Sequence, residues 1–195
     1  MLKSAIIALV RLLFKVLNGL SIDGIEKIPE TGRLILACNH LSNADPPAVM
    51  SEVSRVRKVY VLGKRELFKI GPVSWFLRQF RVIPLDRHRE GGDIAAFRKA
   101  MEVLERDECL LVFPEGTRAR GRVLPPKPGI GYLAHKTGAP VLTLRIFGSE
   151  SFSKLGKITI KVGNIRSYNA AEFTDSKNPY TDFARSVMSD IFSIK

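Results

Sequence analysis

Apolar and polar positions alternate along the chain in two distinct periods. Apolar side chains recur every three or four residues from Ile94 to Leu104, which predicts an amphipathic helix over residues 92–106. Short continuous apolar runs bounded by Gly, Pro or polar residues predict buried strands. These runs cover residues 33–38, 59–62, 81–85, 109–113, 140–147 and 157–162. Because strands alternate with helices, we predict a single α/β domain with a mostly parallel central sheet flanked by helices.

Three further helices are predicted from their boundaries or from their apolar faces. Asp45 precedes two prolines, and Asp as N-cap followed by Pro at the first helical position predicts a helix that runs towards Arg55. Residues 131–136 form a shorter helical segment after a loop rich in Pro and Gly. The apolar face of a terminal helix is formed by Phe183, Val187, Ile191 and Ile194.

The N-terminal segment, residues 1–22, has a pattern of its own and precedes the domain of residues 23–195. It is strongly apolar but carries Arg11 and Lys15. On a helical wheel most polar residues share one arc of roughly 120°. The arc holds Lys3, Ser4, Arg11, Lys15 and Asn18, with Ile7 and Phe14 among them. An Arg in mid-membrane costs about 2.5–3.5 kcal/mol, so we predict an amphipathic interfacial helix and no spanning helix. The alternative is an ordinary packed helix.

The charge balance demands an anionic partner. Lys and Arg number 31 against 19 Asp and Glu, which gives a net charge of +12 over 195 residues. Suitable partners are a phosphorylated metabolite, an anionic lipid surface, an acidic carrier protein or a nucleic acid. We do not expect a nucleic acid, because the sequence lacks cations interleaved with aromatic residues and lacks a familiar reading helix. The two cysteines, Cys38 and Cys109, lie in apolar runs and are predicted to be packing residues.

Three loops follow the carboxyl ends of predicted strands, where active residues gather in parallel sheets. The first loop, residues 39–45, carries His40 and Asp45. If the loop reverses, the carboxylate can accept a hydrogen bond from one ring nitrogen, and the other nitrogen can then act as the base for an alcohol. The alternative is that Asp45 only caps its helix and His40 is a plain loop residue. The spacing alone does not decide between them.

The other two loops, residues 86–89 and 114–120, supply residues suited to a phosphorylated polyol. Arg87 and Arg118 can grip a phosphate with paired hydrogen bonds. Gly116 allows close approach of the backbone, Thr117 can donate a hydrogen bond, and Glu115 can bind a hydroxyl group or hold the arginines. For each arginine the alternative is a solvated surface charge. The three His residues are scattered without Cys or carboxylate at ligand spacing, so no metal site is predicted.

Four segments resemble, in order and in separation, the signature motifs of the glycerolipid acyltransferases related to bacterial 1-acyl-glycerol-3-phosphate acyltransferase. They are Asn-His-Leu-Ser-Asn-Ala-Asp-Pro at residues 39–46, Ile-Pro-Leu-Asp-Arg at 83–87, Phe-Pro-Glu-Gly-Thr-Arg at 113–118 and Ala-Pro-Val at 139–141. The chain departs from the motifs at Arg81, where the family usually has Gly, at Ala119, where Ser is usual, and at Thr143, where a second Pro is common. These departures leave the acceptor open to another lysolipid or an amino-lipid.

The resemblance implies a function and a set of site residues. It implies a glycerol-3-phosphate acyltransferase-like fold and transfer of a fatty acyl group from acyl-CoA or acyl carrier protein to a lysophospholipid, most directly 1-acyl-glycerol-3-phosphate. It implies no metal and no organic cofactor, and a peripheral location at the cytoplasmic face of the cell membrane. His40 would be the base and Asp45 its partner. The implied substrate contacts are Arg87, Glu115, Gly116, Thr117, Arg118, Asn39, Ser42, Lys64 and Pro140. A non-catalytic lipid-binding protein is a further alternative, but it has no need of His40 and Asp45.

Residues 67–80 hold more apolar side chains than an exposed segment usually carries. The apolar residues are Leu67, Phe68, Ile70, Trp75, Phe76, Leu77 and Phe80, and the surrounding cations are Lys64, Arg65, Lys69 and Arg78. Given the acyl substrate that the resemblance implies, we predict that this helical ridge lines the acyl-chain groove and contacts lipid headgroups. Plain packing into the core is an alternative of equal weight.

Overall fold

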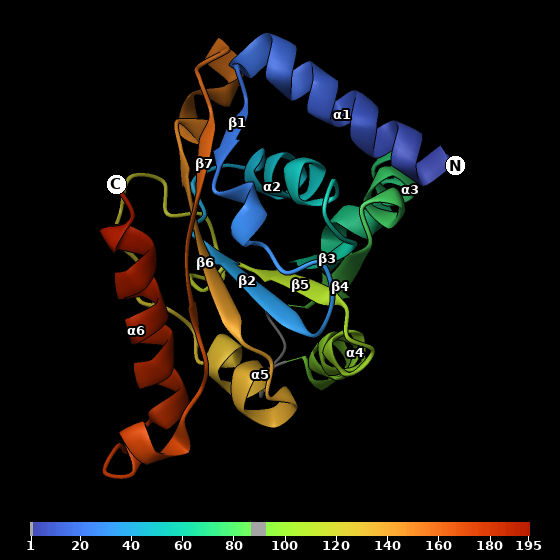
Figure 1. Cartoon of the computed structure of the whole chain (residues 1–195). Helices are drawn as coiled ribbons and strands as arrows, with labels where there is room; N and C mark the ends of the chain where they lie inside the picture. Colours follow the sequence, from blue (N-terminus) through green and yellow to red (C-terminus); the bar gives the residue numbers. More distant parts are fainter. Residues whose placement is uncertain (1, 87–92) are drawn as a thin grey trace.

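The computed structural model describes residues 2–86 and 93–195 and places a seven-stranded sheet at the centre of the molecule (Figure 1). The strand order is β1-β7-β6-β2-β5-β3-β4. Every neighbouring pair is parallel except β6 and β7, which are antiparallel. The strands are β1 Ser21–Asp23, β2 Leu34–Cys38, β3 Val59–Lys64, β4 Val82–Leu85, β5 Cys109–Val112, β6 Val141–Phe147 and β7 Thr159–Arg166. The predicted α/β class with a mostly parallel sheet is therefore confirmed.

Helices cover both faces of the sheet, so the sheet is buried on both sides (Figure 1). Helices α1 Leu2–Asn18 and α2 Asp45–Val53 pack on one face, with α3 Gly71–Gln79 beside them. The opposite face is covered by α4 Ile94–Glu105, α5 Gly129–Thr137 and α6 Pro179–Ser193. Strand β2 shows the resulting alternation, because Leu34 and Leu36 enter one core and Ile35 and Ala37 enter the other.

Short elements account for most differences from the sequence predictions. Strand β1 has only three residues, too few for an apolar run to indicate it. Short 3-10 helices also lie at η1 Ile25–Lys27, η3 Ser149–Lys154 and η4 Ala170–Phe173. The predicted ridge at residues 67–80 divides into η2 Arg65–Lys69 and α3. Leu67, Ile70 and Trp75 are exposed there, whereas Phe80 is buried in the core. Only part of the segment therefore packs into the core.

Helix α1 leaves most of its large apolar side chains exposed and buries only two of them. Ile7 and Phe14 are buried in the same core as the sheet, and Arg11 pairs with Glu52 of α2. The exposed apolar face consists of Leu2, Leu9, Leu12, Leu13, Val16 and Leu17, each 48–72% exposed. In the described parts of the chain, no helix has the length and apolar character needed to cross a membrane.

Candidate active site

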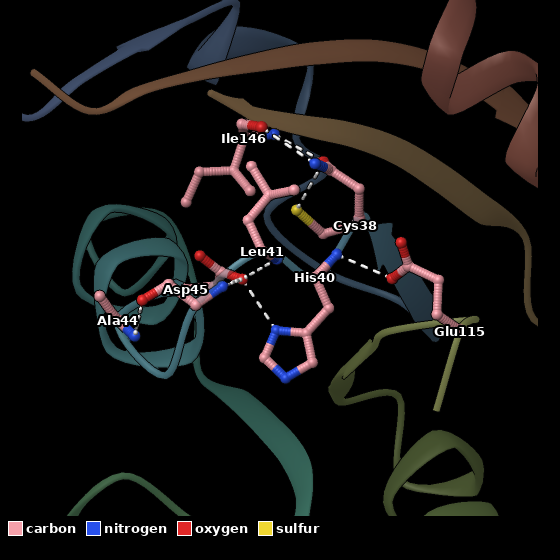
Figure 2. A network of polar contacts seen from close by, with 9 residues as sticks. Cys38, His40, Leu41, Ala44, Asp45, Glu115 and Ile146 are labelled. Carbon is pink, nitrogen blue, oxygen red and sulfur yellow. Dashed lines mark hydrogen bonds and ion pairs between the residues drawn. The ribbon is translucent and has the colours of Figure 1, made fainter. Parts of the chain in front are cut away.

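The candidate site begins where β2 ends and the chain leaves the sheet. Strand β2 pairs with β6 as far as Cys38, and Asn39 is the next residue. The Asn39 side chain continues the pairing: its Nδ2 donates to the carbonyl oxygen of Ile146 at 3.0 Å, and its Oδ1 accepts from the N–H of Ile146 at 2.8 Å (Figure 2). Because the side chain takes over the partner of the main chain, the backbone can turn away from the sheet at His40.

The loop of residues 39–45 is closed by the carboxylate of Asp45. Its Oδ2 accepts the N–H groups of Leu41 at 2.6 Å and Ser42 at 2.8 Å and lies 2.8 Å from Nδ1 of His40 (Figure 2). Asp45 is fully buried, and these donors compensate the charge that burial would otherwise disfavour. A carboxylate oxygen accepts hydrogen bonds, so this contact favours the tautomer in which Nδ1 is the donor and Nε2 is left as the acceptor nitrogen.

The predicted helix cap at Asp45 is wrong. Helix α2 begins at Asp45, Ala44 occupies the N-cap position, and no side chain caps the helix. The carboxylate is engaged by the loop before it, which supplies two backbone donors and the imidazole ring. The same residue therefore orients His40, and the alternative in which it only caps its helix is excluded.

Two residues from the β5 loop hold His40 from the other side. The Phe113 ring stacks on the imidazole, with centroids 4.3 Å apart. The carboxylate of Glu115 accepts the His40 N–H at 2.8 Å (Figure 2). Glu115 is 2% exposed, and burial raises the pKa of its carboxyl group from 4.5 to about 7, although the His40 N–H opposes this shift. Glu115 therefore supports the loop of His40, and among residues 2–86 and 93–195 no arginine forms an ion pair with it.

The segment after Glu115 approaches the His40 loop again. Gly116 has a φ of 69°, in the left-handed region that glycine tolerates, and its N–H bonds to the carbonyl of Phe113. Thr117 is exposed. The N–H of Ala119, three residues after Gly116, donates to the carbonyl oxygen of His40 at 2.8 Å. These bonds fix Arg118 between two anchored residues.

An apolar pocket of about 660 Å³, here called the catalytic pocket, lies beside this loop. Its apolar lining includes Val10, Leu13 and Leu17 of α1, Phe76 of α3 and Phe152 of η3. Its polar lining includes Arg118, Glu150, and Ser42 and Asn43 from the loop of His40. The pocket thus brings an apolar surface of α1 together with a cation and with the loop that carries His40. Of residues 67–80, only Phe76 lines this pocket, and the acyl-groove role of the segment stays a prediction.

The remaining predicted site residues do not all join this group. Ser42 lies in the pocket wall, and its Oγ accepts the Ala44 N–H at 3.2 Å. Lys64 is exposed at the end of β3 and lies outside the wall of the catalytic pocket. Arg87 is outside the described residues. Pro140 precedes β6, whereas His40 follows β2. Because β6 runs parallel to β2, Pro140 and His40 lie at opposite ends of the strands. The structure therefore does not bring Pro140 to the loop that carries His40.

Sequence reasoning missed two aromatic residues of the site. The sequence places Phe113 at a strand end and in the Phe-Pro-Glu-Gly-Thr-Arg motif but does not predict its contact with His40, and it assigns no role to Phe152. An aromatic residue directly before the Pro-Glu-Gly-Thr-Arg run at a strand end could have indicated Phe113. Phe152 had no such signal, because it reaches the pocket from η3, far from the other motifs in the sequence.

Comparison with known proteins decides the family. A model of the acyltransferase family matches residues 19–147, which include the His40 loop and the Arg118 loop. The chain belongs to the acyltransferase family. The match extends to named relatives. A chloroplastic 1-acyl-sn-glycerol-3-phosphate acyltransferase of Brassica napus is 28% identical over 69% of this chain, and an enzyme of that name from Borreliella burgdorferi is 31% identical over 67%.

The similarity also holds in three dimensions. The crystal structure of the 1-acyl-sn-glycerophosphate acyltransferase from Thermotoga maritima superimposes on this acyltransferase with a TM-score of 0.72 at 26% sequence identity. The superposition covers 99% of this chain and 80% of that one. The chain spans 39% of the Brassica relative's length and 52% of the Borreliella relative's length.

Proposed function

We propose that this acyltransferase moves a fatty acyl group from a thioester donor to the free hydroxyl group of 1-acyl-glycerol-3-phosphate and so forms phosphatidic acid. The observation that carries the proposal is the 2.8 Å contact between His40 Nδ1 and Asp45, which leaves Nε2 as a base. The names of the relatives support the acceptor. The apolar pocket, whose lining includes Arg118, also suits a lipid with a phosphate head.

The proposed chemistry follows from the two nitrogens of His40. Nε2 takes the proton of the acceptor hydroxyl as its oxygen attacks the thioester carbonyl, and Asp45 stabilises the imidazolium that forms. The tetrahedral intermediate collapses with cleavage of the C–S bond. The leaving thiolate takes the proton back from Nε2, which restores neutral His40. The stacked Phe113 ring and the Glu115 contact would keep the imidazole in one orientation throughout.

We further propose that the acceptor reaches the site from a membrane on which α1 lies. The support is the exposed apolar face of α1, whose Leu13 and Leu17 also line the catalytic pocket. A lysolipid could keep its tail beside this face while its phosphate reaches Arg118. The same arrangement would place the protein peripherally, at the cytoplasmic face of the cell membrane, where thioester donors are made. Either acyl-CoA or acyl carrier protein fits this proposal.

The decisive experiment measures product formation by mass spectrometry. Purified protein receives a panel of lysophospholipids that differ in headgroup, together with acyl-CoA or acyl carrier protein as donor. We expect transfer to 1-acyl-glycerol-3-phosphate by the wild type and its loss in His40→Ala, with the thermal unfolding midpoint preserved. Full activity in His40→Ala would reject His40 as the base. Preference for another headgroup would reject the proposed acceptor while leaving the chemistry intact.

A further inference from the structure

A second pocket lies beside α1, on the flank away from the catalytic pocket. It has a volume of about 240 Å³, and five of the residues that line it are cations; it is here called the cationic pocket. The cations are Arg11, Arg55, Arg57, Lys58 and Arg81. They come from α1, from the end of α2 and from the segments before β3 and β4. Hydroxyl groups of Ser4, Ser51 and Ser54 also line it.

The positive charge of this pocket is only partly neutralised within the described chain. Glu52 is shared by Arg11 at 3.3 Å and Arg55 at 3.0 Å, and Lys58 lies 3.9 Å from Glu108. Arg57 donates its hydrogen bonds to the backbone carbonyls of residues 29, 31, 32 and 107, so its charge meets no carboxylate. Two carboxylates therefore face five cations. The carboxyl end of α2 adds about half a negative charge, which does not cancel this excess.

Arg81 takes part in this pocket at a cost to its own backbone. Its φ is 49°, in the left-handed region that favours glycine. In the family motif that residues 83–87 resemble, the position of Arg81 usually holds Gly. The chain thus has an arginine where glycine would be less strained. Among the described residues Arg81 has no ion pair, so no structural salt bridge accounts for it. The surrounding structure holds Arg81 in this conformation, and Arg81 lines the cationic pocket.

The position of the pocket indicates what reaches it. Ser4, Ala8 and Arg11 of α1 line the cationic pocket, whereas Leu13 and Leu17 line the catalytic one. On a helical wheel the exposed Leu9, Leu12 and Val16 lie between these two flanks. If this apolar face enters a bilayer, both pockets lie at the level of the lipid headgroups. This step rests on the membrane contact that we proposed for α1.

We propose that the cationic pocket binds the phosphate group of an anionic phospholipid, at a site separate from the acceptor site at Arg118. Arginine guanidinium groups suit a phosphate because they donate paired hydrogen bonds. A lipid held there fixes the rotation of α1 on the membrane and thereby directs the catalytic pocket towards the leaflet. The pocket thus acts as an orienting site and takes no part in the transfer.

The test compares two triple variants that remove equal charge. The pocket variant is Arg55→Gln, Lys58→Gln and Arg81→Gly, and the control is Arg98→Gln, Lys99→Gln and Arg106→Gln at α4, on the opposite face of the sheet. Binding is measured by flotation with phosphatidylcholine vesicles, with and without an anionic phosphomonoester lipid. We expect the pocket variant to bind anionic vesicles on the order of a hundredfold more weakly and the control to change less than about twofold. All three proteins should bind neutral vesicles equally.

The single variant Arg81→Gly separates binding from folding. Glycine relieves the left-handed strain, so its unfolding midpoint should equal or exceed that of the wild type while anionic vesicle binding falls about fivefold. Equal losses in the two triple variants would mean diffuse attraction and would overturn the site. Undiminished binding in the pocket variant would do so too. Inorganic phosphate at about 10 mM can bind the same groups, and its binding is measured as a rise in the unfolding midpoint of the wild type. If phosphate raises this midpoint while the pocket variant still binds vesicles fully, the ligand of the pocket is free phosphate and the proposed lipid is rejected.

Two further measurements keep this proposal distinct from the proposed function. His40→Ala should bind anionic vesicles as the wild type does, because His40 lies outside the cationic pocket. The pocket variant should acylate a short-chain, water-soluble lysophosphatidic acid at the wild-type rate, since no membrane is involved. Loss of that activity would make the pocket part of the catalytic machinery and would contradict an orienting role. Inactivity of the wild type would reject the function without affecting the vesicle results.

Discussion

The two flanks of α1 differ in how their charged groups are held. On the catalytic flank the buried carboxylates Asp45 and Glu115 hold His40 and its loop, through hydrogen bonds of 2.6–2.8 Å. On the other flank cations outnumber carboxylates, and Arg55 and Lys58 are exposed to water. Buried charged groups act through individual hydrogen bonds of defined geometry, whereas exposed charged groups act mainly through the electrostatic potential that they create together. Substitutions on the first flank should have large, specific effects, and those on the second should have smaller, salt-dependent ones.

The largest effect is expected from Asp45→Asn on the catalytic flank. The amide can still bond to His40, but its NH2 group can stabilise the wrong tautomer and cannot stabilise the imidazolium. We expect kcat to fall by about 10³–10⁴-fold, with anionic vesicle binding unchanged. Steady-state kinetics and flotation measure the two quantities. A loss of vesicle binding as large as the loss of kcat would show that the two flanks do not act separately.

An intermediate effect is expected from Glu115→Gln, and it should depend on pH. The folded pKa of about 7 lies above the unfolded value of 4.5, so the folded state holds the proton more tightly. Stability is therefore lost as pH rises from 4.5 to 7, by about 3 kcal/mol in total, and the loss persists above pH 7. The amide oxygen of Gln can still accept the His40 N–H. Urea unfolding should show the variant more stable than the wild type at pH 8, and this gain should vanish near pH 4.5.

A gain that is the same at both pH values would mean that ionisation of Glu115 is not its source. Cations of the other flank provide the control for this measurement. Arginine stays charged from pH 4.5 to 8, and among the described residues no carboxylate pairs with Arg81, so the effect of Arg81→Gly on the unfolding free energy should stay constant over this range.

The smallest effects come from removing one arginine on each flank. Arg118→Gln should raise the acceptor KM about tenfold, because one charge-assisted hydrogen bond to a phosphate is lost, and should leave vesicle binding unchanged. Arg55→Gln should weaken anionic vesicle binding about fivefold and leave KM for a water-soluble acceptor unchanged. Adding salt should reduce the second effect more than the first. The comparison fails if either variant changes both quantities.

The sequence predicts the parts of this molecule that depend on local patterns. Buried apolar runs locate six of the seven strands, and the rule for strand ends directs attention to His40 and Glu115. The helix-start rule fails at Asp45, because it considers only the helix that follows and not the loop donors that engage the carboxylate. Motif order suggests Pro140 as a site residue, but the order of motifs does not indicate at which end of the parallel strands each motif lies.

The cationic pocket lies beyond such reasoning for a different reason. Arg11 and Arg81 are seventy residues apart in the chain, and each one alone has the appearance of a solvated surface charge. Only the packing of α1 on α2 brings them to one pocket. The high net charge indicates that an anionic partner exists, but its place on the surface is a tertiary property.

The bonds between Asn39 and Ile146 also link the active site to the mechanics of the sheet. The Asn39 side chain bonds to both the N–H and the carbonyl group of Ile146. Strand β2 has already ended there, so its backbone no longer supplies these bonds to β6. To open the His40 loop, the chain must first release a residue from the interior of the sheet, and such residues exchange their amide protons only in near-global unfolding. The geometry of the proposed base should therefore survive as long as the fold itself, and heat inactivation should coincide with unfolding of the sheet.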